Sequence, residues 1–156
     1  MYAELKRVWE EMTSPGQMFS VHRQEVFGNS ILCYENAPAS LRDLWMLSAG
    51  HGDSDYLVYQ DERLTYAQSH KQTAALASEL AAMGVGPGDR VAIAMRNYPE
   101  WMLAYWATVS MGAVVVGMNA WWVPGEMEYA LEDSSPKVLI ADRERLERFR
   151  EIEEKF

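Results

Sequence analysis

Segment 84–119 constrains the fold more than any other part of this chain. Its first glycine can take the left-handed conformation that ends a helix, and residues 86–89, Gly-Pro-Gly-Asp, supply a turn before the apolar run 91–95. A helix beginning at Pro99 separates this run from a second apolar run, 114–116. Because a helix between two buried strands connects parallel neighbours, we predict two parallel strands joined by a right-handed crossover.

Helix start and stop signals define the other elements. We expect Asn97 to cap the crossover helix, Glu100 to lie near its positive end and Gly112 to break it. Capping and periodicity predict the remaining elements in chain order. They are a helix over 2–12, a hairpin within 25–35, a helix begun by Ser40, a hairpin over 56–66, a helix begun by the pair Thr65 and Gln68, a helix over 125–132, a strand over 137–141 and a helix over 143–156.

The order of these elements predicts an α/β fold. We expect a partial doubly wound, mainly parallel sheet with helices on both faces, preceded by a small antiparallel hairpin region. Helical spacing also predicts which side chains face inward. These are Leu41, Leu44, Trp45 and Leu47 in one helix, and Ala67, Ala74, Leu76, Ala77, Leu80 and Met83 in the next.

The uncharged run from Trp101 to Val123 is long enough to cross a bilayer as a single helix. Gly112, Gly117 and the β-branched block 114–116 interrupt it, and its flanks carry no excess of positive charge. A buried helix followed by a buried parallel strand explains the same composition, because such strands are continuously apolar. We therefore expect no transmembrane segment.

Charge and cysteine content exclude several classes of function. The formal net charge is −9, from 23 acidic and 14 basic residues, which disfavours a nucleic-acid or anionic-membrane surface because both need clustered Lys and Arg. Cys33 is the only cysteine, so the chain has no internal disulfide and no thiolate metal cluster. These features are typical of a reducing compartment, and we expect a cytoplasmic protein that binds no nucleic acid.

No motif indicates a catalytic residue or a metal site. The glycines of 84–88 follow a helix and precede a strand, whereas phosphate-binding loops follow a strand and open a helix. His22, His51 and His70 lie far apart, without a carboxylate or cysteine at ligand spacing. We assign this chain no catalytic residue, no metal ligand and no cofactor of its own.

Several stretches in fixed order resemble a known enzyme family. They are Leu64-Thr65-Tyr66, then 84–93 (GVGPGDRVAI), 97–101 (NYPEW) and 111–119 (MGAVVVGMN). Together they resemble the N-terminal part of adenylate-forming (AMP-binding) enzymes, most closely that of fatty-acid acyl-CoA synthetases. The resemblance spans residues 36–141.

This resemblance implies an activity for a parent enzyme. Such synthetases use ATP and Mg²⁺ to convert a fatty or related carboxylic acid to an acyl-adenylate, and then pass the acyl group to CoA, with release of AMP and diphosphate. The family's Pro-Lys-Gly phosphate loop, adenine-binding aromatic motif, ribose-binding Asp and catalytic lysine have no counterpart before Phe156. We therefore expect a non-catalytic, scaffold-forming N-terminal fragment of an acyl-CoA ligase, with ATP, Mg²⁺ and CoA as cofactors of the parent enzyme only.

The resemblance also implies a division of the chain and a set of partners. We expect residues 1–35 to form an N-terminal arm and 36–156 to form the incomplete first part of a large N-terminal domain. Partners would be the carboxylic acid and CoA in the parent enzyme, together with the remainder of that enzyme. Ten Met, six Trp and eight Tyr are a heavy apolar load for a short sheet with open edges, so the isolated chain is expected to form a homodimer or a swapped assembly.

Trp121 is the one candidate for a cofactor-binding residue. The family's loop commonly has Asn, Pro and then a basic residue, which in some acyl-CoA ligases lies near the nucleotide end of CoA. This chain has Asn119-Ala120-Trp121, so an indole replaces the cation. The indole can stack on an adenine ring at the CoA nucleotide rim, or pack the loop against the rest of the enzyme. Both alternatives remain open at this stage.

A second function class is a freestanding, non-enzymatic α/β protein-interaction module of the receiver or flavodoxin type. A receiver needs an acidic cluster and a phosphate-accepting Asp at the strand ends. Met95 and Asn119 occupy those ends here, which disfavours this alternative.

Overall fold

In the computed structural model, which describes residues 1–156, three parallel strands lie side by side in the order β6, β5, β7. They are β5 (Arg90–Ala94), β6 (Val114–Gly117) and β7 (Val138–Ala141). Val91 of the central strand pairs with Val115 on one side and with Val138 on the other. The predicted parallel crossover is therefore confirmed, and the third strand lies on the opposite side of β5 from the second.

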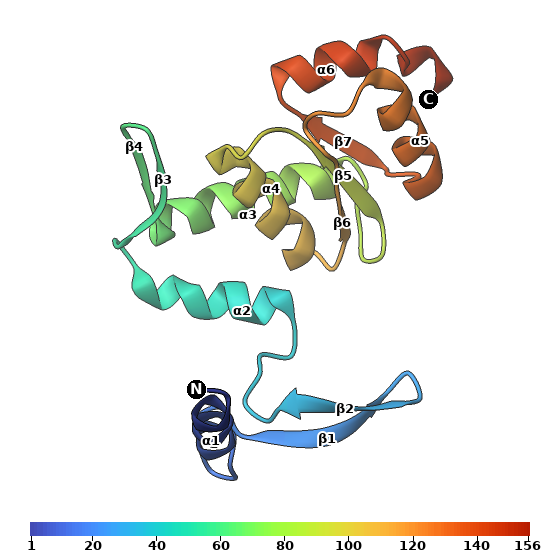
Figure 1. Cartoon of the computed structure of the whole chain (residues 1–156). Coiled ribbons are helices and arrows are strands. Elements are labelled where there is room, and N and C mark those ends of the chain that lie inside the picture. Colours follow the sequence, from blue (N-terminus) through green and yellow to red (C-terminus); the bar gives the residue numbers. More distant parts are fainter. The chain divides into compact units, whose positions relative to one another are not determined.

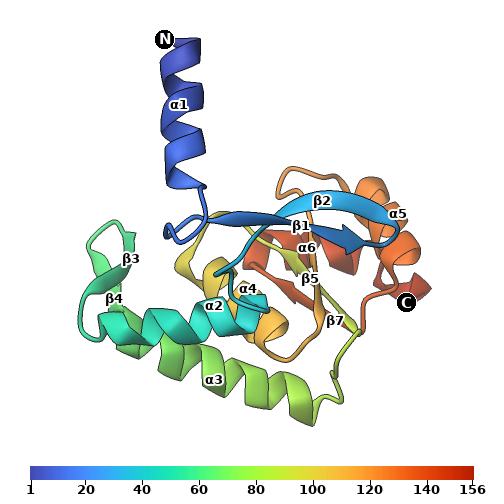
Figure 2. The ribbon, with the colours of Figure 1, turned by 90° about the horizontal axis from the view of Figure 1, so that it is seen from below.

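Helices cover both faces of this sheet, as expected for a doubly wound fold. The helix between β5 and β6 and the helix before β5 lie on one face, and the two helices after β6 lie on the other (Figures 1 and 2). In chain order they are α3 (Tyr66–Ala82), α4 (Pro99–Ser110), α5 (Pro124–Ser134) and α6 (Arg143–Arg150).

The side chains of β5 alternate between the two cores. Val91 packs with Leu80 of α3 and Ala107 of α4, whereas Ala92 packs with Met127 and Leu131 of α5. All four side chains from Val91 to Ala94 are fully buried. A strand buried on both faces must be apolar at every position, which is why this run has no polar alternation.

The uncharged run from Trp101 to Val123 is divided between a helix and a strand. Helix α4 ends at Ser110, and Gly112 has a φ of +77°, which ends the helix and turns the chain toward β6. None of the helices combines the length and the apolar character needed to cross a membrane.

A smaller layer precedes the parallel sheet within residues 40–156. It consists of α2 (Leu41–Ser48), a 3₁₀ turn (Ala49–His51) and the antiparallel strands β3 (Asp55–Tyr59) and β4 (Glu62–Thr65). The predicted hairpin is therefore confirmed, and it forms its own two-stranded sheet.

An aromatic cluster holds this layer on α4. Trp45 of α2 stacks on the His70 ring, with centroids 3.9 Å apart, and on Trp106 of α4, with centroids 4.9 Å apart. The Trp106 Nε1–H donates to the Tyr56 hydroxyl at 2.6 Å. Ser48 Oγ lies 3.0 Å from His70 Nε2, and burial lowers the pKa of His70. Trp45 is thus the anchor of α2.

Two predicted inward faces were right only in part: Trp45 and Leu80 are buried, and Leu76 and Ala77 pack against the core. In α2 only Trp45 is buried, because the stack on His70 and Trp106 turns Leu41, Leu44 and Leu47 toward solvent. In α3 the hydroxyl residues Ser69 and Thr73 line the buried face with Leu80, whereas Ala67, Ala74 and Met83 are exposed.

One predicted helix cap and one predicted helix end also differ from the structure. Tyr98 occupies the N-cap of α4, not Asn97, because Pro99 itself begins the helix. The last helix ends at Arg150 and is followed by a 3₁₀ turn (Glu153–Lys155), so the chain does not form one helix to Phe156. The Thr65 and Gln68 capping box is confirmed.

Residues 1–39 form a separate unit. It contains α1 (Tyr2–Met12), which has no buried residue, and the antiparallel strands β1 (Val21–Val26) and β2 (Asn29–Tyr34). Phe27 and Gly28 connect the strands with positive φ angles of 50° and 78°, the turn geometry that suits a two-residue hairpin. The predicted hairpin is present, and its first strand begins earlier than expected, at Val21.

Candidate functional site

The carboxyl ends of the three parallel strands meet at one edge of the sheet. Arg96 follows β5, Asn119 follows β6 and Asp142 follows β7. Open α/β sheets gather ligands at this edge, where the strand order reverses. A binding site is therefore expected at this edge.

Asp142 connects two of these strand ends. Its Oδ2 accepts a hydrogen bond from the Arg96 backbone N–H at 3.0 Å, and its Oδ1 accepts one from the Arg145 backbone N–H at 3.0 Å, which caps α6. Burial opposes the charged carboxylate, but these hydrogen bonds and the nearby Arg145 guanidinium prevail and hold the pKa of Asp142 below its ordinary value. The carboxylate is therefore a fixed negative charge of the fold.

Hydrogen bonds within the loop after β6, and others from two arginines of α6, fix the conformation of this loop. Asn119 Oδ1 accepts the Trp121 backbone N–H at 2.9 Å. Arg145 Nε donates to the Ala120 carbonyl at 2.6 Å, and Arg148 Nη1 donates to the carbonyls of Ala120 and Trp122 at 3.0 and 2.9 Å. Two guanidinium groups thus satisfy the loop carbonyls and fix the loop in place.

Arg145 is the most deeply buried charge at this edge, with a relative exposure of 1%. Its Nη1 lies 3.2 Å from Asp142 Oδ2 and 3.0 Å from Glu144 Oε2, whereas its Nη2 has no hydrogen-bond partner. Its guanidinium carbon lies 5.9 Å from the centroid of the Trp121 ring. The sequence offered no signal for this role, because Arg145 is one of several charges in a charged helix.

Trp121 lies at the rim of a cavity in this edge. Its side chain is 68% exposed, and the Arg96 guanidinium carbon lies 5.1 Å from its ring centroid. The cavity has a volume of about 310 Å³ and is lined by Tyr59, Arg96, Asn97, Tyr98, Ala120 and Trp121. Aromatic faces, an amide and a guanidinium therefore converge on one space.

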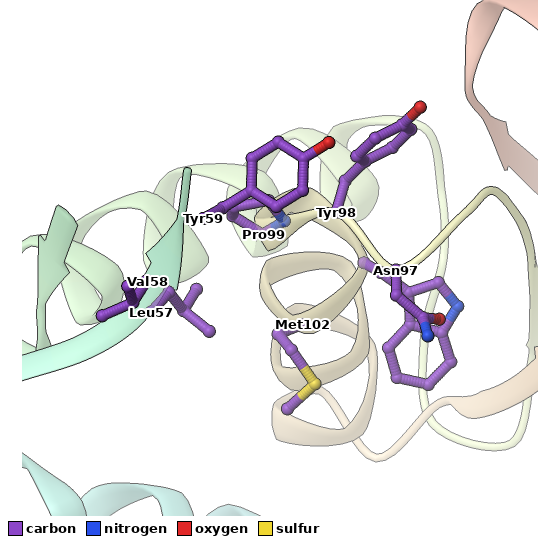
Figure 3. A pocket seen from close by; sticks show the side chains of 8 residues that line it. Leu57, Val58, Tyr59, Asn97, Tyr98, Pro99 and Met102 are labelled. Atoms are coloured by element: carbon purple, nitrogen blue, oxygen red, sulfur yellow. The ribbon is translucent and has the colours of Figure 1, made fainter. Parts of the chain in front are cut away.

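An apolar groove adjoins this cavity. Leu57 and Val58 of β3 lie on one side of it, and the beginning of α4, with Pro99 and Met102, lies on the other (Figure 3). The groove has a volume of about 300 Å³. Tyr59, Tyr98 and Asn97 border both the groove and the cavity, and the two tyrosine rings meet edge to face, with centroids 5.6 Å apart. Sequence reasoning missed the groove, because its two walls come from separate elements.

Residues 45–155 match the model of a protein family described as AMP-binding enzyme. The chain belongs to the AMP-binding enzyme family. The resemblance stated from the sequence is therefore confirmed, and the α/β architecture agrees with it.

Members of the AMP-binding enzyme family with assigned activities are similar to most of this chain. A medium/long-chain-fatty-acid–CoA ligase, FadD6 of Mycobacterium tuberculosis, is 39% identical over 114 residues, which are 72% of this chain and 19% of FadD6. A 3-hydroxybenzoate/4-hydroxybenzoate–CoA ligase of Thauera aromatica is 33% identical over 106 residues, 68% of this chain and 20% of that ligase. The chain thus spans about a fifth of the length of these relatives.

Solved structures of AMP-binding enzymes share the fold. The anthranilate CoA ligase AuaEII, in complex with anthranoyl-AMP, has a TM-score of 0.71 and 26% identity over 75% of this chain and 23% of its own. The N-terminal domain of FACL13 from Mycobacterium tuberculosis has a TM-score of 0.63 and 30% identity over 67% of this chain and 27% of its own. The alternative of a freestanding receiver-type module receives no support from these matches.

The three histidines that were weighed as metal ligands lie apart from one another. His51 contacts Tyr66, His70 stacks on Trp45 and His22 lies in β1. No group of three or more His, Cys, Asp or Glu side chains is placed to hold a metal ion. The site that the structure does assemble is the strand-end edge around Trp121.

Proposed function

We propose that this chain forms the first part of the large N-terminal domain of an ATP-dependent acyl-CoA ligase. That enzyme would join a fatty or related carboxylic acid to CoA through an acyl-adenylate, with ATP, Mg²⁺ and CoA as its cofactors. The observation that carries the proposal is the family match over 45–155, together with relatives named as CoA ligases of both fatty and aromatic acids. Within the proposal, residues 36–156 are the domain part and 1–35 are an N-terminal arm.

The proposed role of this chain is structural. Its sheet has two open edges, β6 and β7, and Val114 on β6 is half exposed. Unpaired strand edges attract further strands, so these edges suit pairing with the remainder of the same enzyme. The cytoplasm is the proposed location, since the chain has a single unpaired cysteine and no disulfide.

Trp121 is proposed to lie at the nucleotide end of CoA in that enzyme. Three features support this role: its exposed indole, its place at the carboxyl edge of the sheet and the cavity beside it. An indole presents a flat apolar face, and a purine stacks on such a face with a gain of about 1–3 kcal/mol per base.

A chimera tests the proposed function. In a ligase such as FadD6, the matching segment is replaced by residues 45–155 of this chain, and ATP-dependent acyl-CoA formation is measured. We expect acyl-CoA from the chimera, none from the ligase lacking the segment and none from the 156-residue chain alone. Circular dichroism and ATP binding establish that the chimera is folded.

Two outcomes would contradict the proposal. A folded, ATP-binding chimera without acyl-CoA formation would argue against a ligase domain. Acyl-CoA formation by the chain alone would argue against a purely structural role.

A further inference from the structure

The apolar groove between β3 and α4 is open to solvent. No charged side chain lines it, and Leu57 and Val58 of β3 lie across from Met102 of α4 in a volume of about 300 Å³ (Figure 3). The Val58 side chain is 58% exposed. Contiguous exposed apolar surface commonly marks a place where another segment binds. The groove is therefore a candidate interaction surface.

The groove runs along the free edge of β3. Leu57, Val58 and Tyr59 all line it, although consecutive side chains of a strand point to opposite faces. A groove that contacts side chains from both faces passes along the edge of the strand. β3 pairs only with β4, on its other edge, and no residue of β4 lines the groove. The free edge of β3 thus forms one wall of the groove.

Val58 offers unpaired backbone groups at this edge. Tyr59 and Glu62 flank the two-residue turn of the hairpin and close its ladder, so the next pair, Val58 with Arg63, is of the non-hydrogen-bonded kind. The N–H and C=O of Val58 consequently point away from β4, and no other element forms a hydrogen bond with them. Such groups on an edge strand are a template for a further strand.

Two carboxylates lie at one end of the groove. Glu62 and Glu100 line a cavity of about 370 Å³. Tyr59 and Tyr98 border both this cavity and the groove. Both carboxylates are exposed, and neither forms an ion pair or a side-chain hydrogen bond. A basic side chain is their electrostatic complement.

Most other charges around this end already have partners. The engaged groups are Asp142 and Glu144 with Arg145, Arg143 with Glu147, Arg63 with Asp55, and Arg96 over the Trp121 ring. Asp61, in the hairpin turn, is a further exposed carboxylate without an ion pair. Asp61, Glu62 and Glu100 thus outnumber Arg96, the one arginine of this group that has no carboxylate partner. This charge disfavours the carboxylate of a fatty acid in the groove and favours a cation.

We propose that the groove binds an extended segment from the remainder of the parent enzyme. The segment pairs with the β3 edge at Val58, packs apolar side chains against Met102 and directs a basic side chain to Glu62 and Glu100. In this mode of strand addition, main-chain hydrogen bonds supply affinity and side-chain contacts supply specificity. The inference rests on the proposed ligase function, because the chain spans about a fifth of the ligases it matches and leaves most of such an enzyme to supply the segment.

Two synthetic peptides test the chemistry of the groove in the 156-residue chain. They are acetyl-Lys-Val-Lys-Val-Lys-Val-amide and acetyl-Glu-Val-Glu-Val-Glu-Val-amide, which share their valines and differ in charge. Binding is titrated by NMR at physiological salt, which screens distant charges. We expect the basic peptide to bind about fivefold to tenfold more tightly and to slow hydrogen exchange of the Val58 amide.

Three variants separate the contacts. Glu62→Gln and Glu100→Gln together should bring the affinity ratio of the two peptides close to one. Glu79→Gln, at an exposed position of α3, is the matched control and should leave the ratio unchanged. Val58→Pro should weaken both peptides, because it removes an N–H that the β3–β4 ladder does not use. Circular dichroism checks folding, and hydrogen exchange of the Val58 amide in the unsubstituted chain tests the same contact if Val58→Pro does not fold.

Three results with the isolated chain would overturn the inference. The first is equal affinity for the two peptides, or no binding of either at millimolar concentration. The second is a preference for the basic peptide that survives the double substitution. The third is protection of the Val58 amide that rises with the concentration of the chain alone, which would assign the groove to a second copy.

The folded chimera with FadD6 tests the occupant. If the remainder of the enzyme fills the groove, the chimera binds neither peptide, and mass spectrometry finds slow hydrogen exchange at Val58. A chimera that forms acyl-CoA but still binds the basic peptide would overturn the inference and leave the ligase function standing. A folded chimera that excludes the peptide but forms no acyl-CoA would support the inference and contradict the ligase proposal.

Discussion

The backbone N–H of Arg96 donates to the carboxylate of Asp142 at 3.0 Å, so the ends of β5 and β7 are joined by one side chain. The same carboxylate caps α6 and pairs with the buried Arg145. One residue therefore fixes the rim of the cavity and supports the helix that holds the loop after β6.

Asp142→Ala should lower the free energy of unfolding by about 3 kcal/mol, because it removes the less exposed of the two carboxylates that pair with the buried Arg145 guanidinium and also removes a helix cap. Urea unfolding followed by circular dichroism measures this loss. Asp133→Ala, at an exposed position of α5, is the matched control and should change stability by less than about 0.5 kcal/mol. Equal losses in the two variants would contradict the proposed dual role of Asp142.

Trp45→Ala should lower the free energy of unfolding by about 3–5 kcal/mol, because the side chain is 3% exposed and stacks on both His70 and Trp106. Leu47→Ala, on the same helix but 69% exposed, should lower the free energy of unfolding by less than about 0.5 kcal/mol. Thermal unfolding of the pair measures the difference. Similar losses would show that Leu47 is buried together with Trp45, as the helical spacing predicted, and would contradict the exposure of Leu47.

Stability should fall as the pH drops through the ordinary pKa of histidine, because His70 titrates differently in the two states. Burial lowers the pKa of His70 in the folded chain, so the unfolded chain binds more protons and acid favours unfolding. The contribution is present above about pH 6.5 and is lost below it. His70→Asn should flatten the dependence of the urea midpoint on pH between about 7 and 5, and an unchanged slope would refute this assignment.

The isolated chain should self-associate. Strands β6 and β7 leave open edges, and large apolar side chains are exposed, among them Met46, Val114 and Tyr129. Sedimentation velocity and binding of a hydrophobic dye measure the effect, and Val114→Lys should reduce association if the β6 edge is used. A compact monomer that binds no dye would contradict this prediction.

Local signals account for much of the fold. The β5 strand, the break at Gly112, the helix begun by Pro124 and the Thr65 and Gln68 capping box were predictable. Each depends on residues close together in the chain, whose conformational preferences act without the rest of the protein. The predictions failed where a tertiary contact prevailed over the local pattern. Helical spacing placed Leu44 and Leu47 inward, but the stack of Trp45 on His70 and Trp106 orients α2 differently.

The sequence by itself determined the strands, the crossover and the family, because backbone preferences and apolar runs are encoded by neighbouring residues. Only the tertiary structure decided that Arg145 is buried against the Ala120 carbonyl, that Arg96 lies beside Trp121 and that Tyr59 meets Tyr98. These contacts join residues distant in the chain, and a buried guanidinium is stable only where folding brings carboxylates and carbonyls to it. No local pattern carries that information, so the strand-end edge becomes visible only in three dimensions.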